Sequence, residues 1–115
     1  NDATIKTLKA RVVAGAANNQ LAEARHGDML RDQKILYAPD YVINAGGLMS
    51  VYYEHAARTS GKPYNRAEVL AHVQKIDETV ESIFRRADKE GISTSTAADR
   101  IAEQRFTPPK KSRAA

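Results

Sequence analysis

The chain has 115 residues, of which 42% are hydrophobic and 28% charged, with a formal net charge of +4 at pH 7 and no cysteine. This length allows one domain with a modest core, and no apolar run approaches the roughly 20 residues that a membrane-spanning helix needs. The composition therefore indicates an ordinary globular protein, and it excludes disulfide bonds, thiolate metal sites and cysteine nucleophiles.

The two ends of the chain differ in character. Much of the positive charge lies in Lys110, Lys111 and Arg113, within a proline-containing tail at residues 107–115 that we expect to be disordered. A phosphate-binding arm is the less favoured interpretation of this tail. Residues 1–4 resemble a loop and helix cap inside a domain, without an initiator methionine or a signal peptide. We therefore expect the chain to begin within a domain of a cytoplasmic protein.

The first third of the chain predicts a unit of two strands and a short helix. Asp2 is expected to cap a short first helix, and residues 11–14 to form a buried strand. Residues 28–33 fit a short helix, which leads into a second buried strand at residues 35–37. Such a strand, helix and strand resemble a βαβ unit, so the two strands are predicted to pair in parallel.

The link at residues 20–27 is predicted to be irregular. It contains His26, which we interpret as a surface or capping residue rather than a metal ligand. No second histidine stands near it at metal-binding spacing, since His55 and His72 are distant in sequence. No metal site is therefore expected.

Each predicted strand is followed by a loop of small residues and asparagine. The first loop is GAANN at residues 15–19, and the second runs from Pro39 to the pair Gly46 and Gly47, beyond which a helix capped by Asn44 is expected. Adjacent parallel strands bring these loops to one edge of the sheet, where open α/β sheets bind ligands. The alternative for each loop is a turn that binds nothing.

Three helices are predicted after the second loop. The first carries Leu48 and Val51 on an apolar face, which the pattern alone interprets as ordinary core residues. Residues 66–91 are predicted to form one long helix, because apolar residues recur in steps of three and four and Gly91 suits its end. A last helix is expected at residues 97–105. A coiled-coil dimer is disfavoured because leucine is missing from the repeat positions.

No complete catalytic motif is present. The sequence contains no GxSxG, GxxxxGK, GxGxxG or HExxH pattern. The residues alone therefore predict a ligand-binding edge of the sheet, but they do not indicate which reaction takes place there.

Two segments together resemble a known family. AGAANNQL at residues 14–21 and YAPDYVINAGG at residues 37–47, at this separation, are similar to paired signatures of the glutamate, leucine, phenylalanine and valine dehydrogenases. The leucine dehydrogenase branch is the most similar, AADRIAE at residues 97–103 also fits its C-terminal helix, and the resemblance extends over residues 1–106.

The resemblance implies an α/β fold in which residues 1–58 form the C-terminal part of a Rossmann-like NAD-binding domain. Residues 59–106 would be long C-terminal helices packed on that domain. The implied activity is NAD-dependent oxidative deamination of an apolar L-amino acid to its 2-oxo acid and ammonia. The bulk of Leu48 favours a branched-chain substrate.

The same resemblance assigns roles to the two loops. Cofactor binding would fall to Ala16, Ala17, Asn18 and Asn44. Substrate binding would fall to Asn18, Gly46, Gly47, Leu48 and Val51. The full-length enzyme is expected to be a homo-oligomer with small-molecule substrates, without nucleic-acid or membrane partners.

The family's phosphate loop, ribose-binding acid and catalytic lysines with an aspartate all precede the region matched here. We therefore expect no catalytic residue in this chain, no activity from it alone, and a truncated sequence or domain fragment. The alternative function is a non-catalytic helical binding or oligomerisation module, suggested by the long helix at residues 66–91. DNA binding through the basic tail is the least favoured hypothesis.

Overall fold

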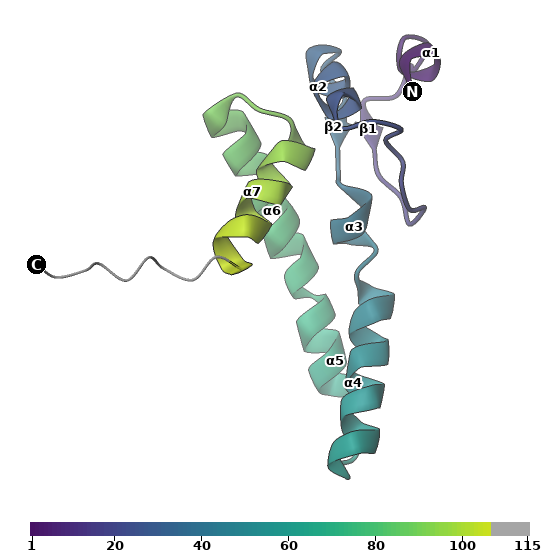
Figure 1. Ribbon diagram of the computed structural model, residues 1–115, viewed down its shortest axis with the longest axis vertical. Coiled ribbons are helices and arrows are strands. Elements are labelled where there is room, and N and C mark those ends of the chain that lie inside the picture. The colour runs from purple at the N-terminus through teal and green to yellow at the C-terminus, as the bar shows by residue number, and fades with distance from the viewer. Residues whose placement is uncertain (107–115) are drawn as a thin grey trace, which may run out of the picture.

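The computed structural model describes residues 1–106, so the predicted tail at residues 107–115 lies outside the described residues. In chain order the elements are α1 (Asp2–Ile5), β1 (Val12–Val13), α2 (Arg25–Asp32), β2 (Leu36–Tyr37), α3 (Asp40–Ile43), α4 (Gly46–Ser60), α5 (Arg66–Val73), α6 (Lys75–Glu90) and α7 (Thr94–Phe106). The strands lie with α1 and α2 at one end of the molecule, and α4 and α5 extend away from them as a hairpin (Figure 1). No helix within residues 1–106 is both long and apolar enough to cross a membrane.

The two strands pair in parallel, as the sequence predicts. Val12 pairs with Leu36 and Val13 with Tyr37. The prediction that the first strand is buried is wrong for the described residues, because the Val12 side chain is 54% exposed. An apolar strand is buried only where helices or further strands cover both faces of its sheet, and the sheet described here has two strands.

A first core lies between α1, α2 and the strands. Its buried members are Ile5, Leu30, Ile35 and Tyr37, and Val13, Leu21 and Met29 pack against them. Asn1 caps α1 in place of the predicted Asp2, because its side-chain oxygen accepts from the backbone N–H groups of Ala3 and Thr4. The short second helix is confirmed, but it begins at Arg25 instead of residue 28.

The chain after β2 forms two helices where one was predicted. Pro39 precedes the single turn of α3, and the Asn44 backbone N–H donates to Asp40 O at 2.9 Å. Asn44 therefore ends α3 and does not cap α4, so that prediction is wrong. Gly46 and Gly47 are the first residues of α4 instead of a turn before it, because Ala45 already has helical φ and ψ angles and accepts from the Met49 N–H.

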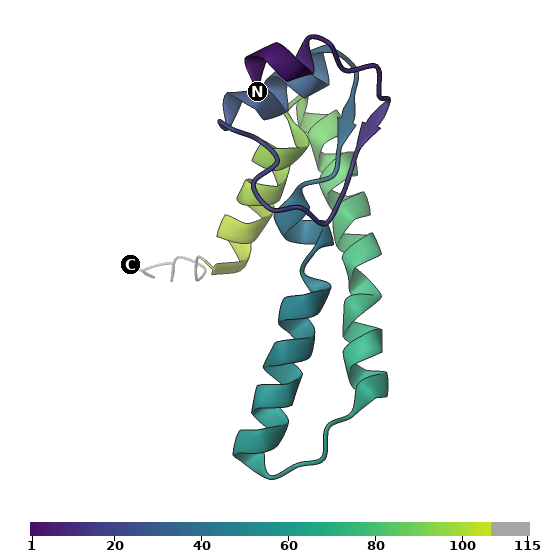
Figure 2. The same ribbon diagram turned by 90° about the vertical axis from the view of Figure 1, so that its right-hand side faces the viewer.

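The long helix predicted at residues 66–91 is present with one interruption. α5 and α6 meet at Gln74, whose φ of −59° and ψ of −22° are helical, so the path continues from one helix into the other (Figure 2). Gly91 ends α6 with a φ of +64°, which confirms the predicted stop. The last helix starts at Thr94, before the predicted residue 97, since Ser93 O already accepts from the Ala97 N–H.

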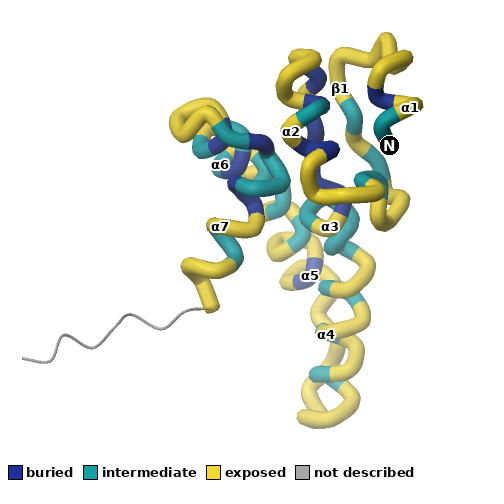
Figure 3. The backbone as a smooth tube through the Cα atoms, turned by 45° about the horizontal axis from the view of Figure 1, so that its top comes forward, coloured by how far each residue is buried: buried dark blue, intermediate teal, exposed yellow. Residues whose placement is uncertain are grey.

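A second core joins α6 to α7. Ile83, Ala87, Ala97 and Ala98 are buried there, and Val42, Phe84, Ile92 and Ile101 pack against them. The small alanines let the two helices approach closely. Burial is concentrated at this junction and beside the strands, whereas no residue of α4 is buried (Figure 3).

Candidate functional site

The two asparagine-bearing loops meet at the carboxyl ends of β1 and β2. Asn44 Nδ2 donates a hydrogen bond to Asn18 Oδ1, across 26 residues of sequence. The structure therefore brings together two of the residues assigned to the cofactor. Both are accessible enough to meet a ligand, since Asn18 is exposed and Asn44 is half-buried.

The first loop folds around a glutamine side chain. Gln20 Nε2 donates to the backbone carbonyl groups of Gly15, at 3.1 Å, and Ala17, at 3.2 Å. A Cβ atom at Gly15 would lie 3.3 Å from Gln20 Nε2, so the absence of a side chain lets the glutamine approach this closely. Ala16 and Ala17 are exposed on the outside of the loop. Their small side chains leave the loop open to a flat ligand.

A buried carboxylate ties the two loops together. The Tyr37 hydroxyl donates to Asp40 Oδ1 at 2.6 Å, and the Asn19 backbone N–H donates to Asp40 Oδ2 at 2.9 Å. Burial, together with the hydrogen bond to Asp40, raises the pKa of Tyr37 to about 12, so the tyrosine remains a donor at neutral pH. Our sequence interpretation gave Asp40 no role in the site. A tyrosine at the end of an apolar strand, three residues before a carboxylate, is the signal that indicates the pair.

The start of α4 presents the residues assigned to the substrate. A Cβ atom at Gly46 would lie 3.7 Å from Val73 Cγ1, so Gly46 faces the hairpin partner, whereas one at Gly47 would meet nothing within 4 Å. Leu48 is 76% exposed and Val51 61% exposed. Within the described residues they are therefore not core residues, and the structure leaves their apolar side chains free to contact another group.

A pocket of about 500 Å³ lies beside the first loop. Asn18, Asn19, Asp40 and Tyr41 contribute to its wall, as does the start of α7. The Tyr41 hydroxyl donates to Asp99 Oδ1 at 2.8 Å, and burial together with this bond raises the pKa of Tyr41 above its ordinary value. The tyrosine thus ties α3 to α7 beside the pocket.

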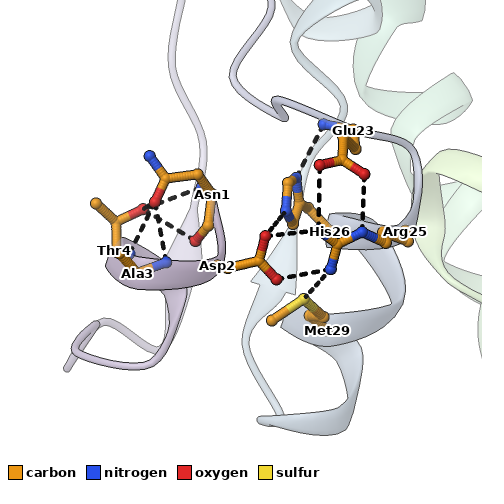
Figure 4. A network of polar contacts seen from close by, with 8 residues as sticks. All are labelled: Asn1, Asp2, Ala3, Thr4, Glu23, Arg25, His26 and Met29. Carbon is orange, nitrogen blue, oxygen red and sulfur yellow. Dashed lines mark hydrogen bonds and ion pairs between the residues drawn. The ribbon is translucent and has the colours of Figure 1, made fainter.

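A polar cluster joins α1 to the start of α2 (Figure 4). His26 is fully buried: its Nδ1 accepts from the Glu23 N–H at 2.9 Å, and its Nε2 lies 3.3 Å from Asp2 Oδ2. The predicted place of His26 on the surface is wrong, and its capping role is not confirmed, because Ala24 is the N-cap of α2 and no side chain caps that helix. The ring is buried because α1 and α2 pack against each other, which the local pattern did not indicate.

This cluster contains a set of possible metal ligands. Donor atoms of Asp2, Glu23 and His26 lie within 4.8 Å of one another. Arg25 pairs with Asp2 at 2.5 Å and with Glu23 at 2.8 Å, and it holds the pKa of both carboxyl groups below their ordinary values. Both carboxylates are therefore already neutralised, and a metal ion would have to displace the guanidinium group.

Comparison with known proteins decides the family. A model of the glutamate/leucine/phenylalanine/valine dehydrogenase family matches residues 1–113. The chain belongs to this family. The family assignment suggested by the two loops is thereby confirmed.

The similar proteins are amino-acid dehydrogenases of several specificities. Leucine dehydrogenase of Bacillus cereus is 48% identical over 113 residues, which are 98% of this chain and 29% of that protein. Phenylalanine dehydrogenase of Caldalkalibacillus thermarum is 46% identical over 92% of this chain and 27% of its own length. The chain thus spans less than a third of these relatives.

Solved structures agree with the fold. The crystal structure of L-tryptophan dehydrogenase from Nostoc punctiforme matches with a TM-score of 0.82 and 45% identity, over 91% of this chain and 30% of that one. Glutamate dehydrogenase from Peptoniphilus asaccharolyticus matches with a TM-score of 0.66 at 23% identity, over 92% of this chain and 29% of that one. At this identity the second match shows the fold alone. The described residues therefore have part of the α/β dehydrogenase fold of this family.

Proposed function

We propose that this chain forms part of the active site of an NAD-dependent L-amino-acid dehydrogenase. Such an enzyme converts an L-amino acid, NAD⁺ and water to a 2-oxo acid, ammonium, NADH and a proton. The observation that carries the proposal is the contact between Asn18 and Asn44 at the carboxyl ends of two parallel strands. Ligands of open α/β sheets bind at this edge.

The two asparagines suit the carboxamide of a nicotinamide. Their mutual bond uses Asn44 Nδ2 and Asn18 Oδ1, so within the described residues Asn18 Nδ2 remains available as a donor and Asn44 Oδ1 as an acceptor. A primary carboxamide offers one acceptor oxygen and an NH₂ donor, the complement of this pair. Ala16 and Ala17 leave room for the ring beside them. When bound, the nicotinamide accepts the hydride from the substrate Cα.

The start of α4 suits an apolar substrate. Leu48 and Val51 are exposed and apolar, and a charged substrate side chain placed against them would lose hydration without gaining a partner. The bulk of Leu48 narrows the space and favours branched aliphatic side chains over aromatic ones. The relatives named for leucine, phenylalanine and L-tryptophan support an apolar substrate in general. Gly47, beside which a Cβ atom would meet nothing within 4 Å, lets the substrate approach the helix backbone, and Gly46 adds no side chain next to it.

The proposal also covers the organisation of the enzyme. Residues 1–58 belong to a Rossmann-like NAD-binding domain, and residues 59–106 form helices that pack on it. The lysines and the aspartate that transfer protons lie in the remainder of the protein. In keeping with the family resemblance, the complete enzyme is a cytoplasmic homo-oligomer.

A chimaeric enzyme tests the proposal. This chain replaces the matching 113 residues of Bacillus cereus leucine dehydrogenase, and NADH formation is measured with leucine, valine and phenylalanine. We expect turnover of leucine and valine in preference to phenylalanine. A chimaera that elutes at the size of the parent enzyme but oxidises none of the three would contradict the proposal.

The exposed surface of α4 favours one other function, a non-catalytic oligomerisation module. Leu48, Val51 and Tyr52 are all more than half exposed. Sedimentation of this chain alone separates the two functions. A compact oligomer that does not bind NADH would favour the module, whereas the dehydrogenase proposal predicts no stable oligomer from this chain alone.

A further inference from the structure

Asp40 is a buried carboxylate that contacts both loops. It is 6% exposed, and each of its carboxylate oxygens accepts from a donor on a different segment. Oδ1 accepts from the Tyr37 hydroxyl at 2.6 Å, and Oδ2 accepts from the Asn19 backbone N–H at 2.9 Å. The side chain is therefore a bridge from the end of β2 to the loop that follows β1.

The bond to Asn19 controls the position of Asn18. The N–H of Asn19 belongs to the same planar peptide unit as the carbonyl group of Asn18, so an acceptor fixed beneath this N–H orients both residues. Asn19 has a φ of +56°, in the left-handed region that few non-glycine residues adopt and that asparagine adopts more readily than most. A conformation of this kind persists when surrounding contacts hold it, and the bond to Asp40 is such a contact.

The tyrosine sets the orientation of the carboxylate. Tyr37 is 2% exposed, and its protonated hydroxyl donates to Asp40 Oδ1 at 2.6 Å. Its backbone carbonyl group accepts from Thr94 Oγ1 at 2.6 Å, which ties this end of β2 to the start of α7. Tyr37 thus holds the Asp40 carboxylate against β2 and the start of α7. The carboxylate in turn holds the first loop through its bond to the Asn19 N–H.

We propose that Asp40 is a positioning residue for the dehydrogenase reaction, which holds Asn18 in the geometry that the nicotinamide and the substrate require, and that Tyr37 orients it. The inference rests on the proposed function. Asp40 does not touch the reacting atoms in this scheme. It acts through the Asn19 backbone, and its effect is on the chemical step.

Two substitutions at Asp40 separate its hydrogen bonds to the two loops from its negative charge. Asp40→Ala removes both contacts. Asp40→Asn keeps an oxygen that accepts from the Asn19 N–H and places an NH₂ group against the Tyr37 hydroxyl, which can then accept. Because Asp40 acts only through Asn18, we expect Asp40→Ala in the chimaeric enzyme to lower kcat by no more than removal of the Asn18 side chain would, about tenfold.

The kinetic pattern distinguishes positioning from a general loss of structure. In Asp40→Ala we expect kcat to fall while the Kd for NADH changes little, because most of the cofactor contacts lie elsewhere in the enzyme. Asp40→Asn should restore most of kcat, and Tyr37→Phe should fall between the two. Asp32→Ala is the matched control: Asp32 is an exposed carboxylate on α2 without a side-chain hydrogen bond to any described residue, and its removal should leave kcat unchanged.

Hydrogen exchange provides a readout that does not depend on activity. In the full 115-residue chain, the Asn19 amide should exchange about tenfold faster in Asp40→Ala, as expected for the loss of one hydrogen bond. Its exchange should stay close to wild type in Asp40→Asn and Asp32→Ala. Unchanged exchange in Asp40→Ala, or an Asp40→Asn enzyme as impaired as Asp40→Ala, would overturn the proposal. A wild-type chimaera without activity would instead overturn the proposed function, and the exchange data would still decide the role of Asp40.

Discussion

Asn44 donates its side-chain N–H to the side-chain oxygen of Asn18, and this bond joins two loops that are 26 residues apart in the chain. Each loop follows one strand of the parallel pair. Parallel strands place their carboxyl ends at the same edge, so the contact is a direct consequence of the pairing. It leaves one amide donor and one amide acceptor for a ligand.

Removing the Asn18 amide should reduce activity with little effect on stability. We expect Asn18→Ala in the chimaeric enzyme to lower kcat/KM by about tenfold, the value of one hydrogen bond, because the side chain is exposed and faces the proposed ligand. Asn65→Ala is the matched control. Asn65 caps α5 by accepting from the Ala67 and Glu68 N–H groups, so its loss should cost about 1 kcal/mol of stability without changing kcat/KM. Steady-state kinetics and urea unfolding measure the two effects.

A smaller residue at position 48 should change the substrate preference. Leu48→Ala widens the proposed pocket and should shift the ratio of kcat/KM values towards phenylalanine over leucine by ~1–3 kcal/mol. Leu70→Ala removes a half-exposed leucine from α5 and should leave the ratio unchanged. The ratio is measured by competition between the two amino acids, and equal ratios in Leu48→Ala and wild type would remove Leu48 from the pocket.

The buried tyrosine makes stability depend on alkaline pH. The pKa of Tyr37 is raised from an ordinary value of 10.0 to about 12 in the folded chain. A raised folded-state pKa favours the protonated form, so the contribution of Tyr37 is complete below pH 10 and is lost as the pH rises towards 12. We expect the urea midpoint to fall over this range, and to fall less in Tyr37→Phe. Parallel curves for the two proteins would contradict this expectation.

The junction of α6 and α7 should dominate the stability of the C-terminal helices. Ile83 is 1% exposed and lies in a cluster with Ala87, Ala97 and Ala98, whose short side chains cannot move to fill a cavity. Ile83→Ala should therefore lower the free energy of unfolding by about 2–5 kcal/mol, as buried truncations do. Glu81→Ala on the same helix removes an exposed ion pair with Arg85. This substitution should change the free energy of unfolding by less than about 0.5 kcal/mol. Urea titration followed by circular dichroism measures both.

Much of the fold was predictable because its signals are local. The spacing of apolar residues indicated the long helix, Gly91 indicated its end, and the short helix between two strands indicated parallel pairing. Boundaries were less accurate. Gly46 and Gly47 were expected to precede α4 but lie in its first turn, since glycine can adopt helical angles as readily as those of a turn.

The candidate site also has features that the sequence predicted and features that only the structure showed. The composition of the two loops and their separation were sufficient for the family assignment, which the match over residues 1–113 confirms. The link from Asp40 to Asn19 was not predictable, since it connects a side chain of one loop to the backbone of another. The burial of His26 was likewise missed, because it depends on the packing of α1 against α2.

The sequence by itself determined the parallel strand pair with its short helix, the two loops of small residues and asparagine, and the family. These properties are encoded within short stretches, through periodicity, proline and glycine positions, and residue type. Only the tertiary structure decided that Asn18 meets Asn44 and that a buried Asp40 holds Asn19. Contacts of this kind depend on the register of two strands and on the packing of helices between distant segments, so they arise only when the whole chain is folded.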